Sequence, residues 1–142
     1  MSVFLTNSPA DTEKIGEKLG GILTGGEVIA YTGDLGAGKT CFTRGLARGL
    51  GYKGNVTSPT FAIINEYLGG RLNLYHFDMY RVTGWEDLYS TGYFDYLDAG
   101  GVIAAEWSEN ITAALPQNTI YVSIEKTDDL CRKITVTGVD LT

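Results

Sequence analysis

Cysteine, histidine and long hydrophobic runs are scarce or missing in this chain of 142 residues. Two cysteines, Cys41 and Cys131, are too few for a disulfide framework, so we expect no disulfide partner and a reducing, cytoplasmic setting. No apolar run reaches the ~18 residues that a transmembrane helix requires. Residues 1–10 lack the basic start and the long apolar stretch of a signal peptide. These absences predict a protein that crosses no membrane.

Basic residues are also few, with 11 Lys and Arg against 17 Asp and Glu and a formal net charge of −6. A protein that binds RNA or DNA by itself normally carries a basic stripe. The pair Arg44 and Arg48 is too small for one, so we expect no direct, tight binding of nucleic acid. The single histidine, His76, shares no recognisable ligand spacing with the two cysteines, which argues against a zinc site.

The length and hydrophobic content predict one globular domain over residues 1–142, and the strands and helices expected along the chain give it an α/β class. Hydrophobic residues make up 44% and charged residues 20% of the chain, as in a globular protein. Strands are expected at residues 3–6, 27–32, 61–67, 72–77, 101–106, 119–124 and 133–139, with a β-hairpin around Gly69-Gly70. A first helix is expected to begin with Ser8 as its cap, and further helices at residues 41–50 and 111–115. Apolar residues of the first helix predict its buried face: Ile15, Leu19, Ile22 and Leu23.

Residues 33–40 match the pattern G-x-x-x-x-G-K-[ST], between an expected strand and an expected helix. This frame is typical of a phosphate-binding loop. Glycines let the backbone N–H groups approach an anion, and the helix start adds partial positive charge. Lys39 would reach the β- and γ-phosphates, and the Thr40 hydroxyl would bind Mg²⁺. The alternative is an ordinary glycine-rich turn, since the chain has 19 glycines, but the Lys-Thr pair at the right offset favours phosphate binding.

Carboxylates at strand ends complete the predicted site. Glu106 ends an apolar strand, where proteins with a phosphate loop hold Mg²⁺ with an acidic side chain; a surface carboxylate is the alternative. Asp78 follows the hairpin strand and could orient the attacking water or a water of the Mg²⁺ shell. Alternatively, Asp78 pairs with Arg81 or caps a turn. Thr60 has the position of a γ-phosphate sensor on a loop.

The nucleotide is expected to be ATP. A GTPase would need an Asn-Lys-x-Asp motif to read guanine, and the sequence has none. Residues 98–101 match D-x-x-G literally, but they precede an apolar strand instead of following one.

Together these motifs resemble the bacterial TsaE (YjeE-type) family, the ATPase of tRNA threonylcarbamoyladenosine biosynthesis. The resemblance spans residues 11 to about 136 and rests on blocks that follow in the family's order: residues 33–40, 43–46, 56–61, 75–81 and 106–109, then Arg132. Many families share the phosphate loop, whereas the set Ser-Pro-Thr-Phe, His-Phe-Asp-x-Tyr-Arg and Glu-Trp-x-Glu is specific.

The resemblance implies a compact, P-loop NTPase-like fold of three layers, in which a mostly parallel central sheet has helices on both sides. It implies a protein that binds and hydrolyses ATP with Mg²⁺ in support of the TsaB–TsaD complex. That complex forms N6-threonylcarbamoyladenosine at position 37 of tRNAs reading codons that begin with A. The net charge of −6 suggests that this protein contacts tRNA only indirectly, through the complex.

Site residues follow from the resemblance by position. Thr40 and Glu106 would bind Mg²⁺, while Lys39, Asp78, Thr60 and Glu106 would serve hydrolysis or a switch. The residues implied in nucleotide binding are Thr12, Gly33, Asp34, Leu35, Gly36, Ala37, Gly38, Lys39, Thr40, Cys41, Trp107 and Arg132. Of these, Thr12 and Arg132 would lie near the adenosine end and Trp107 beside the site. Cys41 stands where the family often has Thr, and residues 83–101 match only loosely.

Two other functions remain open. A small-molecule kinase would need a lid with several arginines, and beyond Arg81 the sequence offers only Arg132. A nucleotide-switched binding module would bind ATP in the same loop with negligible hydrolysis.

Overall fold

The chain combines strands and helices, and the computed structural model describes residues 1–33, 38–56 and 63–141. In chain order the elements are β1 (Ser2–Thr6), α1 (Pro9–Ile22), β2 (Val28–Gly33), α2 (Lys39–Gly49), β3 (Ile64–Tyr67), β4 (Leu74–Asp78), α3 (Trp85–Ser90), α4 (Tyr93–Leu97), β5 (Val102–Glu106), the 3-10 helix η1 (Ser108–Ala114), β6 (Ile120–Lys126) and β7 (Arg132–Thr137). Within the described ranges, no helix is long and apolar enough to cross a membrane.

The strands form one mixed sheet in the order β1-β7-β6-β2-β5-β4-β3. The central strands β6, β2, β5 and β4 run parallel to one another, and antiparallel pairs complete both edges. At one edge β3 and β4 form the predicted hairpin, with Ile64 opposite Phe77 and Tyr67 opposite Leu74. The predicted α/β class, the mostly parallel centre of the sheet and the hairpin are therefore confirmed.

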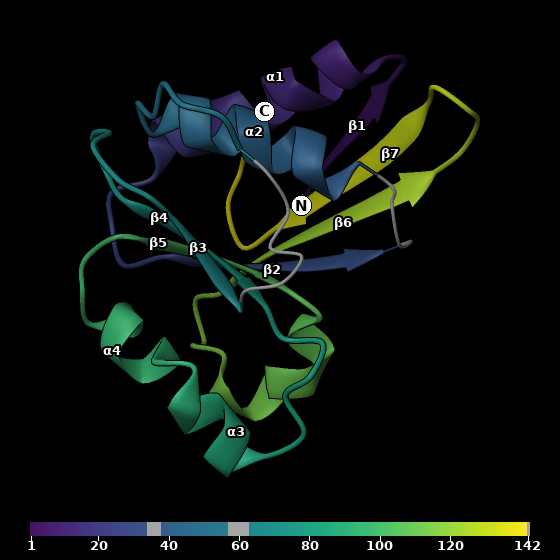
Figure 1. Ribbon diagram of the computed structural model, residues 1–142. Coiled ribbons are helices and arrows are strands. Elements are labelled where there is room, and N and C mark those ends of the chain that lie inside the picture. The colour runs from purple at the N-terminus through teal and green to yellow at the C-terminus, as the bar shows by residue number, and fades with distance from the viewer. Residues whose placement is uncertain (34–37, 57–62, 142) are drawn as a thin grey trace.

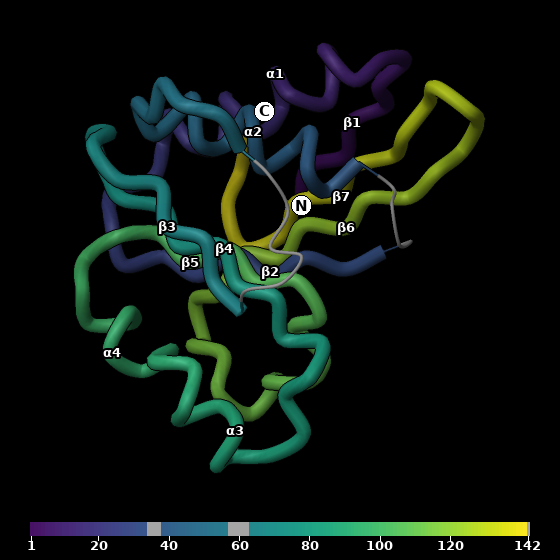
Figure 2. Tube along the Cα trace, in the orientation of Figure 1, coloured from purple at the N-terminus to yellow at the C-terminus, as the bar shows by residue number. Residues whose placement is uncertain are grey.

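Helices cover both faces of the sheet, as expected. The helices α1 and α2 lie on one face, and α3, α4 and η1 lie on the other (Figure 1); the Cα trace shows the same three layers (Figure 2). Successive side chains of a strand point to opposite faces, so the sheet has two cores. Ile29 and Ala104 belong to the core under α1 and α2, whereas Val28 and Ile103 belong to the other. Burial on both faces explains why the central strands are continuous apolar runs.

The helix α1 begins where the sequence predicts. The Ser8 hydroxyl accepts a hydrogen bond from the backbone N–H of Asp11 at 3.2 Å and so caps the helix. The predicted buried face is only partly right: Leu19 and Leu23 are buried, but Ile22 is 46% exposed. The reason is that α1 packs against α2 largely through glycines, which hydrophobic periodicity does not single out.

Four glycines bring the backbones of α1 and α2 into contact. They are Gly16 and Gly20 on α1, and Gly45 and Gly49 on α2. A Cβ added at any of them would collide with a backbone oxygen of the other helix. For Gly45 that atom is the carbonyl oxygen of Glu13. This close approach fixes the place of α1 relative to the first turn of α2.

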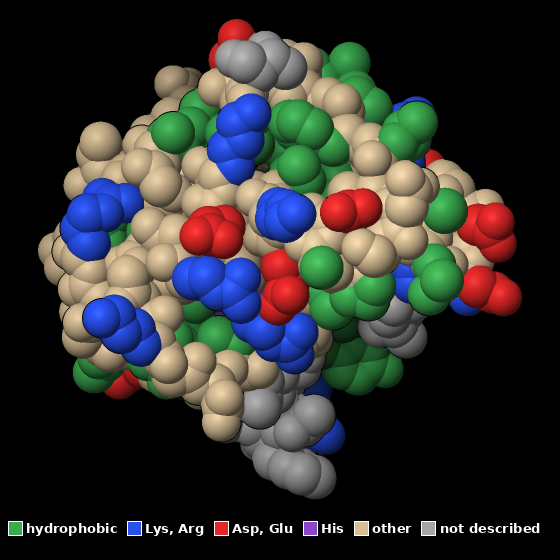
Figure 3. Space-filling view, turned by 90° about the horizontal axis from the view of Figure 1, so that it is seen from above, with side chains coloured by type: hydrophobic (Ala, Val, Ile, Leu, Met, Phe, Trp, Pro, Cys, Tyr) green, Lys and Arg blue, Asp and Glu red, His purple; other side chains and the backbone are tan. Residues whose placement is uncertain are grey.

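Ion pairs cross the same interface on its outer side. Arg44 lies 3.4 Å from Glu13, and Arg48 lies 3.6 Å from Glu13 and 3.7 Å from Glu17. Figure 3 looks onto this side of the molecule and shows basic and acidic side chains next to one another. Since the pairs are half exposed, each contributes only about 0–1 kcal/mol. They nevertheless direct both arginines toward α1.

The glycine contact predicts an asymmetry between two helical glycines. We expect Gly45→Ala to lower the free energy of unfolding by about 1–3 kcal/mol, the usual cost of extra volume in a packed interface. Gly21→Ala is the matched control, because nothing lies within 4 Å of a Cβ added at Gly21. Alanine there should be neutral or stabilise by up to about 1 kcal/mol. Urea unfolding followed by circular dichroism measures both, and equal values would contradict the close-packing account.

Candidate functional site

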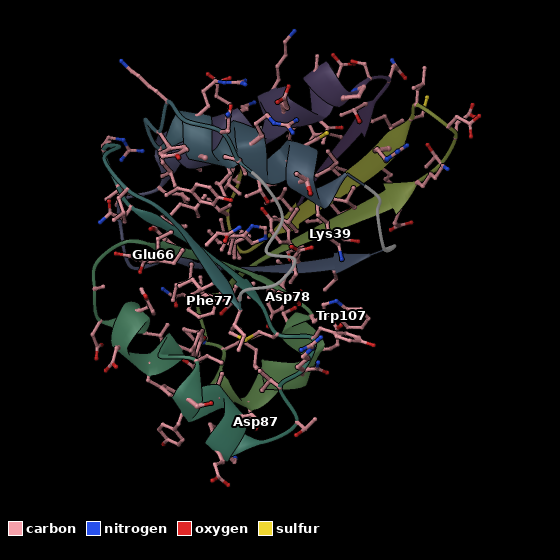
Figure 4. The ribbon with its side chains drawn as sticks, viewed as in Figure 1. Lys39, Glu66, Phe77, Asp78, Asp87 and Trp107 are labelled. Carbon is pink, nitrogen blue, oxygen red and sulfur yellow. The ribbon has the colours of Figure 1, made fainter. Side chains whose placement is uncertain are left out.

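The carboxyl ends of β2, β5 and β4 meet at one edge of the sheet, because the three strands are parallel neighbours. β2 ends there at Gly33, β5 at Glu106 and β4 at Asp78. The register places Asp78 directly opposite Glu106. In Figure 4, Lys39, Asp78 and Trp107 all lie toward this edge. The structure therefore brings together predicted site residues that are distant in the sequence.

The phosphate loop is bounded by two glycines with left-handed backbones. Gly33 has a φ of +107° and Gly38 a φ of +104°, a region that residues with a Cβ rarely enter. At Gly33 a Cβ would also collide with the backbone oxygen of Ile124 on β6. The predicted residues between them, Asp34, Leu35, Gly36 and Ala37, lie outside the described residues, as does Thr60. The described residues on either side of the loop form the strand and the helix that the motif requires.

The helix α2 begins directly after this loop. Gly38 is its N-cap, and no side chain caps the helix among the described residues. The start of a helix carries unpaired N–H groups and partial positive charge, so it attracts an anion. Lys39 and Thr40 form part of the first turn and are partly exposed. Both side chains therefore belong to the helix end at which an anion would be favoured.

The two predicted carboxylates have different neighbours. The Glu106 side chain is 18% exposed, and its Oε2 lies 2.8 Å from Nε2 of His76. Asp78 accepts a hydrogen bond through Oδ1 from the backbone N–H of Tyr80 at 3.0 Å. Asp78 thus caps the turn after β4, which was one of the open alternatives. An ion pair with Arg81, the other alternative, is not among the ion pairs of the described residues.

The chemistry of these side chains suits Mg²⁺ held together with a nucleotide. Magnesium prefers oxygen ligands and is usually bound by one or two carboxylates, substrate phosphates and water. Thr40 and Glu106 offer a hydroxyl and a carboxylate. In the described part of the chain, no three His, Cys, Asp or Glu side chains converge as a metal cage. The residues therefore fit a magnesium site that phosphate oxygens complete.

Trp107 follows β5 in a strained backbone conformation. Its φ of +58° is the only positive φ of a non-glycine residue in the described ranges, and such residues cluster at functional sites. Its ring packs against Tyr80, with ring centroids 4.8 Å apart. The next residue, Ser108, donates a hydrogen bond from its hydroxyl to the carbonyl oxygen of Tyr31 at 3.1 Å. The turn at Trp107 is therefore tied to β2.

A buried polar chain that the sequence interpretation missed lies beneath the site. The Thr43 hydroxyl donates to the Lys39 carbonyl oxygen at 2.7 Å, so its oxygen is left to accept from the Tyr31 hydroxyl, also at 2.7 Å. Burial raises the pKa of the Tyr31 phenol far above its ordinary value, and the nearby Glu106 carboxylate adds to this effect. A tyrosine within the apolar run of residues 28–31 was the one available signal. These two hydrogen bonds link β2 to the first turn of α2.

A small cavity of about 40 Å³ lies beside the start of α2, next to the start of α1 and the start of β7. It is lined by Ser8, Pro9, Thr12, Gly38, Cys41, Asp129, Leu130 and Arg132. Four of these were predicted to contact the nucleotide, namely Thr12, Gly38, Cys41 and Arg132. The Thr12 hydroxyl is hydrogen-bonded to that of Thr6 at 2.9 Å. The structure thus gathers residues from α1, α2 and β7 beside the phosphate loop.

A larger cavity, of about 640 Å³, lies elsewhere. It is lined by Arg44, Ala47, Arg48, Tyr52, Lys53, Gly54, Asn55 and Val56. Size alone would favour this cavity as the functional site, but none of the predicted site residues lines it. Its two arginines already have Glu13 and Glu17 as partners. The edge formed by β2, β5 and β4 is therefore the better candidate.

Comparisons of the sequence and of the structure with known proteins point to one family. The family model described as "Threonylcarbamoyl adenosine biosynthesis protein TsaE" matches residues 6–134. The tRNA threonylcarbamoyladenosine biosynthesis protein TsaE of Treponema pallidum is 41% identical over 132 residues, covering 93% of this chain and 97% of that protein. The protein of the same name from Bacillus subtilis is 43% identical, covering 94% and 84%. The crystal structure of B. subtilis YdiB matches with a TM-score of 0.76 and 37% identity, covering 95% of this chain and 83% of that one.

The buried polar chain predicts a difference between two substitutions of Thr43. Thr43→Val keeps the shape of the side chain but leaves the buried Tyr31 hydroxyl without its partner, which should cost about 1–3 kcal/mol of stability. Thr43→Ser keeps the hydroxyl and should cost less. Chemical denaturation measures both variants. A valine variant as stable as the serine variant would show that the hydrogen bond does not support the site.

Proposed function

Because the chain belongs to the TsaE family of threonylcarbamoyl adenosine biosynthesis proteins, we propose that it binds and hydrolyses ATP with Mg²⁺ in the formation of threonylcarbamoyladenosine in tRNA. The observation that carries this proposal is that the start of α2 and two carboxylates lie at the same edge of the sheet. The start of α2, with Lys39 and Thr40, follows β2 and is capped by no described side chain, and two carboxylates end the neighbouring strands. Phosphate binding and metal binding both need these groups, and they need them together.

The phosphate groups are bound at the start of α2 in this proposal. Lys39 contacts the β- and γ-phosphates, and the first N–H groups of the helix donate to phosphate oxygens. Bound Mg²⁺ would neutralise charge on the phosphates. The Thr40 hydroxyl and the Glu106 carboxylate would hold the ion, and the Asp78 carboxylate would orient the attacking water. Thr60 stays a predicted sensor of the γ-phosphate.

The adenosine end of ATP is assigned to the side of α2 where Thr12, Cys41 and Arg132 line the small cavity. Arg132 is held in place by its own backbone surroundings, since it donates to the carbonyl oxygens of Asp128 and Cys131. Trp107 directly follows β5, whose carboxyl end lies at the same sheet edge as the predicted phosphate site. The nucleotide would therefore extend from this edge across the N-terminus of α2 to the small cavity.

The arginines support a protein that hydrolyses ATP slowly by itself. A P-loop ATPase gains roughly 10³–10⁵ in rate when an arginine neutralises the transition state. Arg44 and Arg48 are paired with carboxylates of α1, and Arg71 donates to the carbonyl oxygens of Leu23 and Gly20. These three side chains are occupied away from the predicted phosphate site, and with Arg132 assigned to adenosine only Arg81 is left for the arginine-rich lid that a small-molecule kinase would need.

Partner proteins would then supply the positive charge that speeds hydrolysis. We propose TsaB and TsaD as these partners, with tRNA bound through them in the cytoplasm, because a chain of net charge −6 is poorly suited to bind RNA. A partner could provide a cation at the predicted phosphate site.

Removal of the phosphate-binding charge tests the nucleotide site. We expect Lys39→Ala to weaken ATP binding by roughly 10–100-fold, because a hydrogen bond to a charged group contributes about 1.5–3 kcal/mol. Lys53→Ala, at an exposed lysine after α2, is the matched control and should bind ATP normally. Calorimetric titration measures both. ATP affinity of the Lys39 variant equal to that of the control would remove the phosphate-loop assignment.

A second substitution separates a metal ligand from a surface carboxylate. We expect Glu106→Gln to raise the Mg²⁺ concentration needed for half-maximal hydrolysis at least tenfold, roughly 1.4 kcal/mol, since an amide brings no charge to the ion. Glu109→Gln, in the same Glu-Trp-Ser-Glu segment, should leave the requirement unchanged. Hydrolysis rates over a magnesium series give the answer. The metal role fails if the two variants need the same Mg²⁺ concentration.

The partner proposal predicts a conditional activity. The isolated protein should turn over ATP slowly, and addition of purified TsaB and TsaD from the same organism should change the rate and produce ATP-dependent association. Turnover measured by phosphate release, together with size-exclusion chromatography, tests both points. Rapid hydrolysis by the isolated chain, indifferent to both proteins, is the contrary result.

A further inference from the structure

His76 is a buried polar group that the proposed site does not explain. It lies on β4, two residues before Asp78, and its side chain is 1% exposed. Neither ring nitrogen has a hydrogen-bond partner among the described residues. Native proteins keep few such groups, because each costs about 1–3 kcal/mol. A buried imidazole without a hydrogen-bond partner among the described residues, beside a proposed metal ligand, suggests a functional role.

The neighbour of His76 is the Glu106 carboxylate. Its Oε2 lies 2.8 Å from Nε2, which is the length of a charge-assisted hydrogen bond. The contact is nevertheless not a hydrogen bond in this structure, since neither ring nitrogen has such a partner among the described residues. His76 is in register with Ala104, two residues before Glu106, so the two side chains project from the same face of the sheet. A rotation of one group would therefore complete the bond.

Of the two groups, the imidazole is the one held in place. Tyr31 packs edge-on against it, with ring centroids 6.2 Å apart and planes at 78°. The Tyr31 hydroxyl is tied through Thr43 to the carbonyl of Lys39, in the first turn of α2. The Glu106 side chain, in contrast, is partly exposed at the end of its strand. The carboxylate is thus the group with room to turn.

We propose that His76 is a positioning residue that orients the carboxylate of Glu106. With its proton on Nε2, the imidazole donates to Oε2 and leaves Oε1 for the metal ion. Hydrogen bonds of this kind are often poorly aligned in a free enzyme and tighten in the complex, and groups that orient a metal ligand tune its affinity. The inference rests on the proposed function, because the metal role of Glu106 is part of that proposal.

Three substitutions of His76 separate positioning from packing. Gln places its amide nitrogen near the site of Nε2, Asn places it near Nδ1, and Leu offers no donor. His76→Gln should therefore bind metal nearly as the wild type does, whereas His76→Asn and His76→Leu should weaken metal binding in the presence of ATP by roughly 10–100-fold. Mn²⁺ serves as the probe, and electron paramagnetic resonance counts the free ion. ATP affinity without metal should be the same in all three variants.

Thermal unfolding of the same variants excludes a purely structural role. His76→Leu removes an unpartnered buried group, so it should be at least as stable as His76→Asn although both bind metal poorly. Metal affinity that simply follows thermal stability would overturn the proposal, and so would equal metal affinity in all three variants.

The free protein allows a test that needs no nucleotide. The chain has one histidine, so labelling with ¹⁵N-histidine gives a single imidazole in the NMR spectrum. We expect the proton on Nε2 and a marked shift of the ring signals in Glu106→Ala, but not in the control Glu109→Ala. A proton on Nδ1, or a ring spectrum indifferent to Glu106→Ala, would overturn the proposal. If the wild type binds no metal with ATP, the proposed function fails, and the imidazole spectra alone decide whether His76 orients Glu106.

Discussion

In a parallel sheet the carboxyl ends of the strands lie along one edge, and β2, β5 and β4 are parallel neighbours in this protein. The pairing brings Gly33, Glu106 and Asp78 together from three separate parts of the sequence. It also puts the start of α2 at the same edge as the two carboxylates, because β2 ends at this edge and only a short loop separates α2 from β2. The local positive charge of a helix start and the negative charge of two carboxylates thus become neighbours, which is the electrostatic requirement for holding a phosphate and a cation together.

Two buried contacts keep this arrangement in place. The glycines between α1 and α2 set the distance of α1, which carries Thr12, from the phosphate-loop helix. Below the loop, Tyr31 and Thr43 join β2 to the first turn of α2. Both contacts depend on backbone groups as much as on side chains. A change in either should therefore move the site as a whole instead of removing one ligand.

The sequence predicted the features that repeat locally. Alternating strands and helices follow from hydrophobic patterns, and the loop with Lys39 and Thr40 follows from a motif in a strand–loop–helix frame. Glu106 was predicted as a metal ligand because a carboxylate at the end of an apolar strand is a local signal. Patterning failed at Ile22, which is exposed, since the buried face of α1 consists partly of glycines that have no hydropathy signal.

Contacts between distant residues could not be predicted in this way. His76 was considered only as a zinc ligand and was set aside, yet it lies 2.8 Å from Glu106 on the adjacent strand. The bond between Tyr31 and Thr43 depends on how α2 is seated on β2, and no spacing in the sequence reports that. The assignments of Thr60 and of residues 34–37 fall outside the described residues and stay predictions.

We propose that one edge of the sheet binds the phosphates of ATP and a magnesium ion. A crystal structure with Mg²⁺ and a non-hydrolysable ATP analogue is the decisive experiment. We expect phosphates at the first turn of α2, with the ion between the Thr40 hydroxyl, the Glu106 carboxylate and phosphate oxygens. A nucleotide bound instead in the large cavity beside Arg44 and Lys53, or an ion that Glu106 does not approach, would contradict it.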